Sequence, residues 1–161
     1  MKKVILKALS IIFATLLLTL AVASCGGNGG GDGYVFKVDS LTLQIGVSAD
    51  VVRTQLGEPL NKNVTAACGG IPGEDIVYTY AGYRVKTTPG KNGDVICMIE
   101  LTDDSVSTPE GLTIGSTKDK VISTMGKGET VGENLIYAKG NMKLQFLIRD
   151  GYVTNIQYLA K

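Results

Sequence analysis

IGVSADVVRTQLG (residues 45–57) and IGSTKDKVISTMG (residues 114–126) are two versions of one pattern, separated by 69 positions. Both have a hydroxyl residue at the fourth position, Asp at the sixth and Gly at the thirteenth. Ser48 and Thr117, the hydroxyl residues, are of the type that caps helix N-termini, and a glycine is common just after a helix. Apolar residues at the eighth and twelfth positions share one helix face. Each stretch therefore predicts a short helix.

A two-residue turn follows the first predicted helix. Residues 76–80 and 83–87 alternate in polarity around Ala81-Gly82, which pairs Tyr80 with Tyr83 in an antiparallel hairpin. The predicted faces carry Tyr78, Tyr80, Tyr83 and Val85 on one side, and Val77, Thr79, Arg84 and Lys86 on the other.

The second predicted helix is followed by the same arrangement. Residues 135–139 and 142–146 flank Gly140-Asn141, and the equivalent register unites four apolar side chains on one face. These are Leu135, Tyr137, Leu144 and Phe146, whereas Lys143 and Gln145 face the other way.

Residues 95–101 and 153–158 predict a further strand in each half. A strict two-residue turn before Val153 would put Val153 and Ile156 on opposite faces, so a bulge or a longer loop is required there. The predicted fold is α+β, with two tandem repeats at residues 34–106 and 107–161. Each repeat has a helix and three antiparallel strands, and the pair packs as one unit with the helices on one face of the sheet.

The N-terminal segment predicts where the protein works. A basic start, an apolar run and the sequence Val22-Ala23-Ser24-Cys25 resemble a bacterial lipoprotein signal peptide over residues 1–24. Cleavage would leave Cys25 as a lipidated N-terminus that anchors the protein to a membrane outside the cytoplasm. Residues 25–33 are glycine-rich and predict a flexible tether. A simple secretory signal and an uncleaved spanning helix are the alternatives.

The amino-acid composition limits which functions are possible. Removing residues 1–24 changes the net charge from +1 to −2, which does not favour nucleic-acid binding. The sequence has no histidine, which excludes His-dependent catalysis and His-ligated zinc. The paired acids Glu74-Asp75 and Asp103-Asp104 have no fuller ligand pattern around them, so we expect turn residues there. We therefore expect no catalytic site, no metal and no cofactor.

Two cysteines remain when Cys25 is assigned to lipid. Cys68 and Cys97 are 29 positions apart, and a location outside the cytoplasm would permit a disulfide between them. Two buried free thiols are the alternative.

The Ile-Gly-x-[Ser/Thr]-x-Asp-x-Val pattern with its terminal glycine, followed by a Tyr-containing hairpin, resembles the β-lactamase-inhibitor-protein-like superfamily over about residues 38–160. That group includes a small lipoprotein of the outer-membrane β-barrel assembly machinery. The chain is also similar to uncharacterised lipoproteins of Gram-positive bacteria. The resemblance implies an antiparallel sheet with helices on one face, used for contact with other proteins.

Two sets of residues are candidates for a binding surface. Tyr78, Tyr80 and Tyr83 could contact a partner, since tyrosine is common at interfaces, or could form core beneath the helix. If they are core, the open face bears Arg84, Lys86, Lys143 and Gln145. We expect a non-catalytic, membrane-anchored module that binds a protein. Inhibition of an extracellular hydrolase is the alternative.

Overall fold

The computed structural model describes residues 32–67 and 71–161. The predicted signal peptide, Cys25 and Cys68 lie outside this part of the chain. The N-terminal half contains β1 (Phe36–Val38), β2 (Leu41–Leu43), α1 (Asp50–Gln55), β3 (Asn61–Ala66), β4 (Glu74–Tyr80), β5 (Tyr83–Thr88) and β6 (Val95–Leu101). The C-terminal half contains α2 (Lys118–Met125), β7 (Glu129–Val131), β8 (Asn134–Lys139), β9 (Met142–Arg149) and β10 (Tyr152–Ala160).

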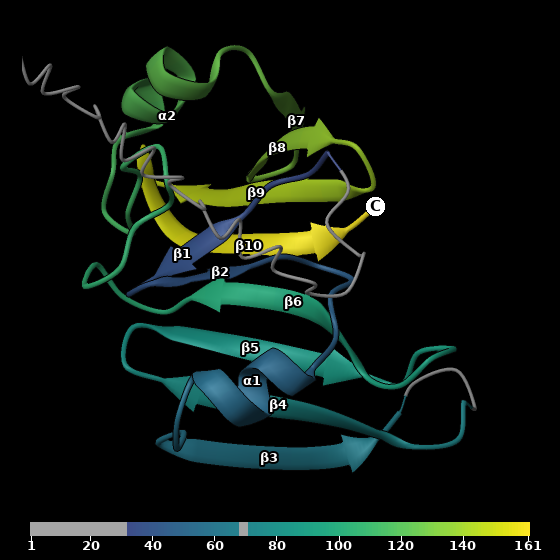
Figure 1. The fold of residues 1–161 in the computed structure, drawn as a ribbon. Coiled ribbons are helices and arrows are strands. Elements are labelled where there is room, and N and C mark those ends of the chain that lie inside the picture. The colour runs from purple at the N-terminus through teal and green to yellow at the C-terminus, as the bar shows by residue number, and fades with distance from the viewer. Residues whose placement is uncertain (1–31, 68–70) are drawn as a thin grey trace, which may run out of the picture.

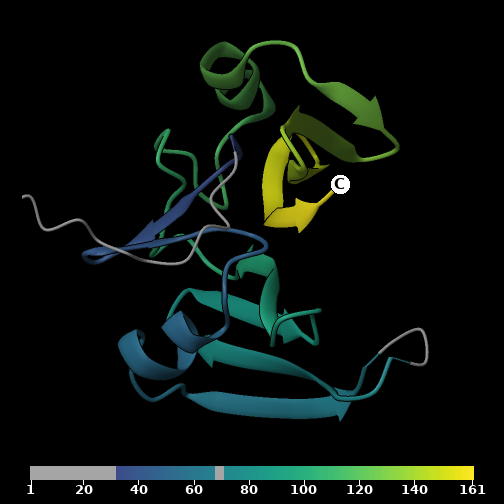
Figure 2. The same cartoon turned by 45° about the vertical axis from the view of Figure 1, so that its right-hand side comes forward.

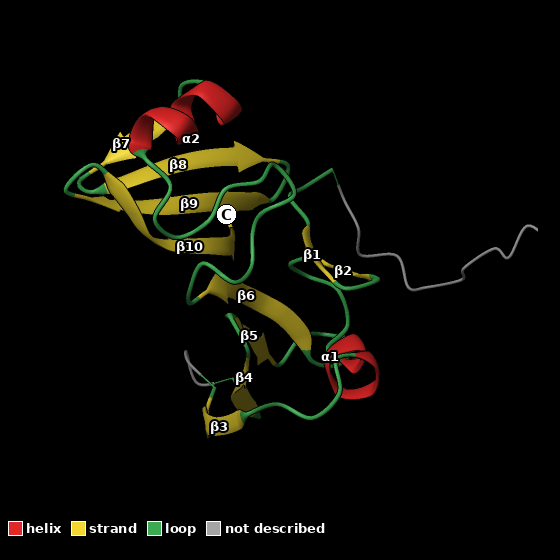
Figure 3. Ribbon diagram, turned by 90° about the vertical axis from the view of Figure 1, so that its left-hand side faces the viewer, coloured by secondary structure: helices red, strands yellow, loops and turns green. Residues whose placement is uncertain are grey.

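The fold is α+β and is dominated by one antiparallel sheet of eight strands in the order β3-β4-β5-β6-β10-β9-β8-β7 (Figure 1). The last strands of the two halves, β6 and β10, pair at its centre, with Tyr158 opposite Ile99. A separate hairpin of β1 and β2 crosses in front of this junction. In Figure 2 the hairpin, α1 and α2 lie on the same side of the sheet. The opposite side is not covered by either helix (Figure 3).

Both predicted hairpin registers are confirmed. Tyr80 pairs with Tyr83 in the first hairpin, and Tyr137 pairs with Leu144 in the second. Of the two predicted explanations for the last strand, a bulge or a longer loop, the structure has a bulge inside β10, because the pairing of β10 with β9 shifts between Val153 and Asn155. The extra residue turns both Val153 and Ile156 toward the core, where they are 1% and 0% exposed.

The expectation of three strands after each helix is wrong, since each helix is followed by four. The additional strands, β3 and β7, form the two edges of the sheet. Every residue of β3 and β7 is exposed, so neither strand carries the alternation of apolar and polar residues that reveals a half-buried strand. Without that alternation, no pattern in the sequence marks residues 61–66 as a strand.

The two helices end as predicted but begin differently. Gly57 and Gly126 follow the helices with φ of 72° and 82°, values that favour glycine. Thr117 caps α2, and its Oγ1 accepts a hydrogen bond from the Lys120 amide at 3.1 Å. Ser48 is not the N-cap of α1. Ala49 takes that position without a side-chain hydrogen bond, and its amide donates to the Asp94 carbonyl at 2.8 Å.

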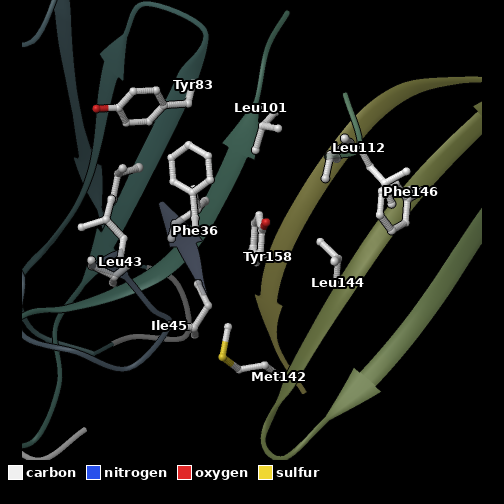
Figure 4. Packing of buried hydrophobic residues seen from close by; sticks show 14 of the residues in the cluster. Phe36, Leu43, Ile45, Tyr83, Leu101, Leu112, Met142, Leu144, Phe146 and Tyr158 are labelled. Carbon is white, nitrogen blue, oxygen red and sulfur yellow. The ribbon is translucent and has the colours of Figure 1, made fainter. Parts of the chain in front are cut away.

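A single hydrophobic core joins the halves. It contains Val52 of α1 and Val121 of α2 together with the inward side chains of the sheet. Phe36 of β1 is fully buried and packs on Tyr83 from one half and on Tyr158 from the other, with ring centroids 5.2 and 5.9 Å apart (Figure 4). The β1–β2 hairpin therefore adds an aromatic side chain to the seam between β6 and β10.

Candidate functional site

The open face is the side of the sheet opposite α1 and α2, and two rows of side chains cross its four central strands. Strand pairing aligns the first row as Arg84, Glu100, Gln157 and Gln145, and the second as Lys86, Met98, Leu159 and Lys143. The predicted residues Arg84, Lys86, Lys143 and Gln145 are thus brought onto one surface, at the ends of the rows. Three strand spacings separate the ends, or about 14 Å at 4.8 Å per strand.

Glu100 organises the first row. Its carboxylate accepts hydrogen bonds from Asn155 Nδ2 at 2.7 Å, from Gln157 Nε2 at 3.1 Å and from Arg84 at 3.3 Å. The Glu100 side chain is only 14% exposed, so these donors compensate its partial loss of water. Asn155 and Gln157 belong to β10 and Glu100 to β6, so the network spans the junction of the two halves.

The second row has an apolar centre. Met98 and Leu159 are half-buried neighbours, and a lysine stands at each end of the row. Lys86 is neutralised by Asp75, with 2.8 Å between Nζ and Oδ2, and the Asp75 side chain is 4% exposed. Lys143 has no carboxylate within 4 Å in the part of the chain that the structure describes. The open face is consequently less basic than its residue types suggest.

Tyr78, Tyr80 and Tyr83 do not form a binding surface, because they are 6%, 7% and 5% exposed. They face α1 in the core, and the rings of Tyr80 and Tyr83 stack with centroids 5.1 Å apart. Burial is the main cause that raises the pKa of Tyr83, to about 12. The residues lie on the predicted strand face, but that face is packed and closed to a partner.

Cys97 is a half-buried free thiol in the structure. Its Sγ donates to the Lys86 carbonyl at 3.5 Å, and burial raises the pKa of the thiol despite the nearby Lys86 ammonium. Because Cys68 lies outside the described residues, their pairing stays a prediction.

Asp75 and Asp103, which belong to the two paired acids of the sequence, are held by hydrogen bonds to neighbouring residues. Asp75 accepts from Thr88 at 2.7 Å in addition to its ion pair with Lys86. Asp103 accepts from the amide of Ser105 at 2.8 Å, and the hydrogen bonds of Ser105 lower the pKa of this carboxyl. Within residues 32–67 and 71–161, His, Cys, Asp and Glu form no group of three able to hold a metal ion.

The described chain starts on the side of the sheet that carries the helices. Asp32 pairs with Lys139 at 3.2 Å, and Gly33 lies against Met142 and the buried Gln44. A cavity of about 310 Å³ opens beside this entry point. Its volume is at the lower limit of ordinary ligand pockets. No helix of residues 32–67 and 71–161 has the length and apolar character to span a membrane.

Sequence reasoning missed Met98, Glu100, Asn155, Gln157 and Leu159. Alternation along each strand indicates that these side chains share a side with the predicted residues. The missing information was that β6 pairs with β10, which is a contact between residues more than 50 positions apart.

Comparisons with known proteins do not show a family. No protein-family model matches the chain, and no curated protein matches it. Two solved structures are similar over most of its length. One is the DUF4309 family protein YjgB from Bacillus subtilis, with 19% identity, a TM-score of 0.45, and coverage of 71% of this chain and 79% of the other. The second is an extracellular protein containing a SCP domain from Bacillus anthracis, with 12% identity, a TM-score of 0.45, and coverage of 78% and 48%.

Proposed function

We propose that this chain is a non-catalytic lipoprotein of the bacterial cell envelope that binds a protein partner through the open face of its sheet. The two aligned rows across β5, β6, β10 and β9 are the observation that carries this proposal. They bring a compact group of side chains from both halves onto a side that neither helix covers.

The chemistry of the rows favours a protein partner. Protein interfaces combine an apolar centre with a polar rim. Met98 and Leu159 supply the apolar centre, while Lys143, Gln145 and Arg84 supply polar groups around it. The Glu100 carboxylate already accepts from three side chains, so it is better suited to fixing the shape of the surface than to acting as a base.

The proposed anchor is compatible with access to this surface. Lipid on Cys25 would be connected through residues 26–31 to Asp32 and Gly33, which lie against Lys139 and Met142. Met142 is a core residue on the helix side of the sheet, and it is 4% exposed. The tether would therefore join the body on the side away from the open face.

Loss of fatty-acid labelling in Cys25→Ala would support the lipid anchor. Equal labelling of the wild type and Cys25→Ala would contradict it.

We also propose that the halves are copies of one repeat unit, as in the superfamily that the sequence resembles. Two contacts support this at equivalent positions. The Gly46 amide donates to the Ile96 carbonyl and the Gly115 amide to the Val153 carbonyl, each at 2.8 Å. Ser48 forms an isolated antiparallel β-bridge with Val95, and Thr117 forms a β-bridge of the same kind with Tyr152.

The pairing of Cys68 with Cys97 belongs to the same proposal about an extracytoplasmic protein. Mass spectrometry of non-reduced peptides would detect the cross-linked pair. If the protein is purified from the cell envelope of the bacterium that makes it and Cys97 is found as a free thiol, the pairing is contradicted.

A matched pair of substitutions tests the binding surface. Leu159→Asp places a charge at the apolar centre of the second row, whereas Ile122→Asp changes an exposed apolar residue, 38% exposed, on α2. We expect affinity capture from detergent-solubilised envelopes to recover the same partner with the wild type and Ile122→Asp but not with Leu159→Asp. Equal capture by all three would contradict the proposal. A hydrolase as the recovered partner, inhibited by the wild type, would favour the inhibitor alternative.

A further inference from the structure

The two edges of the sheet are protected to different degrees. The edge strand β7 spans three residues, whereas β3 spans six and pairs with β4 without a shift in register. Proteins usually shorten, bulge or charge their edge strands, because an unpaired edge can accept a further strand. β3 has full length, no bulge and a single charged residue, Lys62.

The register of β3 directs several backbone groups toward solvent. Tyr80 and Tyr83 flank a two-residue turn and form a hydrogen-bonded pair, so the odd-numbered residues of β4 direct their backbone groups to β3. The hydrogen bond from the Ala67 amide to the Gly73 carbonyl, 3.1 Å long, agrees with this alternation. The N–H and C=O groups of Lys62 and Val64 consequently point away from β4.

The side chains of this edge define what could pair with it. Lys62 and Val64 lie on the helix side of the sheet, opposite Tyr78 and Ile76 of β4. Val64 is 42% exposed and the preceding Leu60 is 77% exposed. Lys62 Nζ lies 5.8 Å from the centre of the Tyr78 ring, and no carboxylate of residues 32–67 and 71–161 pairs with it. The strand thus offers a cation next to an exposed apolar side chain, Val64, on the same face.

We propose that β3 binds an extended segment of a partner protein by strand addition. The segment would carry an acidic residue with an apolar residue two positions away from it. The acid would face Lys62, the apolar residue would cover Val64, and the outward backbone groups would supply main-chain hydrogen bonds. This site is separate from the open face, so either proposal can fail alone.

Charge favours such a segment over a second copy of this chain. Antiparallel self-pairing centred on Asn63 would place Lys62 opposite Val64 of the other copy. The two Lys62 residues would then be diagonal neighbours, about 7–8 Å apart, with no acid in β3 to compensate them.

Two synthetic peptides test the proposal on the detergent-solubilised full chain. The probes are acetyl-TVTDTVT-amide and acetyl-TVTKTVT-amide, whose side-chain pattern is the same in both strand directions. By calorimetry we expect the Asp peptide to bind about 2- to 5-fold more tightly than the Lys peptide, as an exposed ion pair allows. Lys62→Glu should reverse that preference. An unchanged preference, or no binding of either peptide at millimolar concentration, would overturn the proposal.

A proline substitution tests the backbone pairing. Val64→Pro removes an outward N–H while the pairing with β4 keeps its donors, a position where an edge strand tolerates proline. We expect this substitution to lower the affinity for the Asp peptide about tenfold. Thr130→Pro is the matched control at the other edge, where the β7 register also turns the N–H outward, and it should leave binding unchanged.

Two further measurements complete the test. If Val64→Pro does not fold by circular dichroism, the peptide should instead slow amide exchange at Lys62 and Val64 of the wild type. Absence of that protection counts against strand addition. Self-association of the wild type that Val64→Pro abolishes would overturn the proposal in favour of a second copy.

Discussion

The two halves of the molecule hold similar helices with different contacts. In the C-terminal half, the Thr117 side chain caps α2, and α2 has eight residues. In the N-terminal half, α1 has six residues and no side-chain cap, and Arg53 instead pairs with Asp94 in the loop before β6. At α2 the N-cap side chain accepts from the Lys120 amide. At α1 the N-cap residue has no such side chain, and the hydrogen bond from the Ala49 amide to the Asp94 carbonyl adds a tertiary contact to a local one from the Asp50 amide to Ser48 Oγ, 3.2 Å long. One sequence pattern can therefore be stabilised in two ways.

The largest expected effect tests whether the halves fold as one body. Phe36→Ala removes the ring that packs on Tyr83 of one half and Tyr158 of the other. We expect a loss of about 3–5 kcal/mol in the free energy of unfolding. Urea unfolding followed by tyrosine fluorescence and by circular dichroism should give one coincident, weakened transition. Two separate transitions, with only one of them shifted, would show that the halves unfold independently.

The second prediction compares substitutions at the N-terminal ends of the two helices. Thr117→Ala removes the side-chain cap of α2 and should cost about 1 kcal/mol of unfolding free energy. Ser48→Ala should cost less, because Ser48 lies before the N-cap Ala49, whose amide is bonded to Asp94, and Ser48 Oγ accepts only from the Asp50 amide at 3.2 Å. Urea titration of both variants measures the difference. Equal losses would contradict the assignment of a capping N-cap side chain to α2 alone.

A third pair compares the tyrosines that contact the glycine after each helix. Tyr137 Oη donates to the Gly126 carbonyl at 2.8 Å, whereas the equivalent distance from Tyr80 Oη to the Gly57 carbonyl is 3.5 Å. Tyr137→Phe should cost about 0.5–1.5 kcal/mol, the usual net value of one hydrogen bond. Tyr80→Phe should cost less because its bond is longer. A larger loss for Tyr80→Phe in urea unfolding would reverse this part of the comparison.

The smallest expected effect is the contribution of Tyr83 to the free energy of unfolding, which changes only at alkaline pH. Burial raises the pKa of Tyr83 from 10.0 to about 12. The folded state therefore holds this proton more tightly than the unfolded chain. The resulting stability is complete below pH 10 and is lost as the pH rises toward 12.

Tyr83→Phe should reduce the fall in unfolding free energy between pH 9 and 11. Tyr152→Phe, at an exposed tyrosine, is the control. An identical fall in the wild type and Tyr83→Phe would show that Tyr83 does not contribute.

The candidate site was partly predictable for the same reason as the hairpins. A two-residue turn and an alternating strand fix which side chains share a face, so Arg84 and Lys86 could be placed together, as could Lys143 and Gln145. These two pairs are joined into rows because β6 pairs with β10. Most of the C-terminal half separates these two strands in the sequence. Glu100 and Asn155 are 55 positions apart, and nothing local to either residue indicates that they form a hydrogen bond.

The sequence alone determined the two hairpin registers, the glycine ends of both helices and the need for either a bulge or a longer loop at the last strand. These features depend on turn chemistry and on the period of neighbouring side chains, which act over a few residues. Only the tertiary structure decided that Tyr78, Tyr80 and Tyr83 are core, that β3 is an open edge, and that Phe36 packs at the seam. Those outcomes depend on which distant surfaces fit together, because burial is a property of the packed chain and not of a segment.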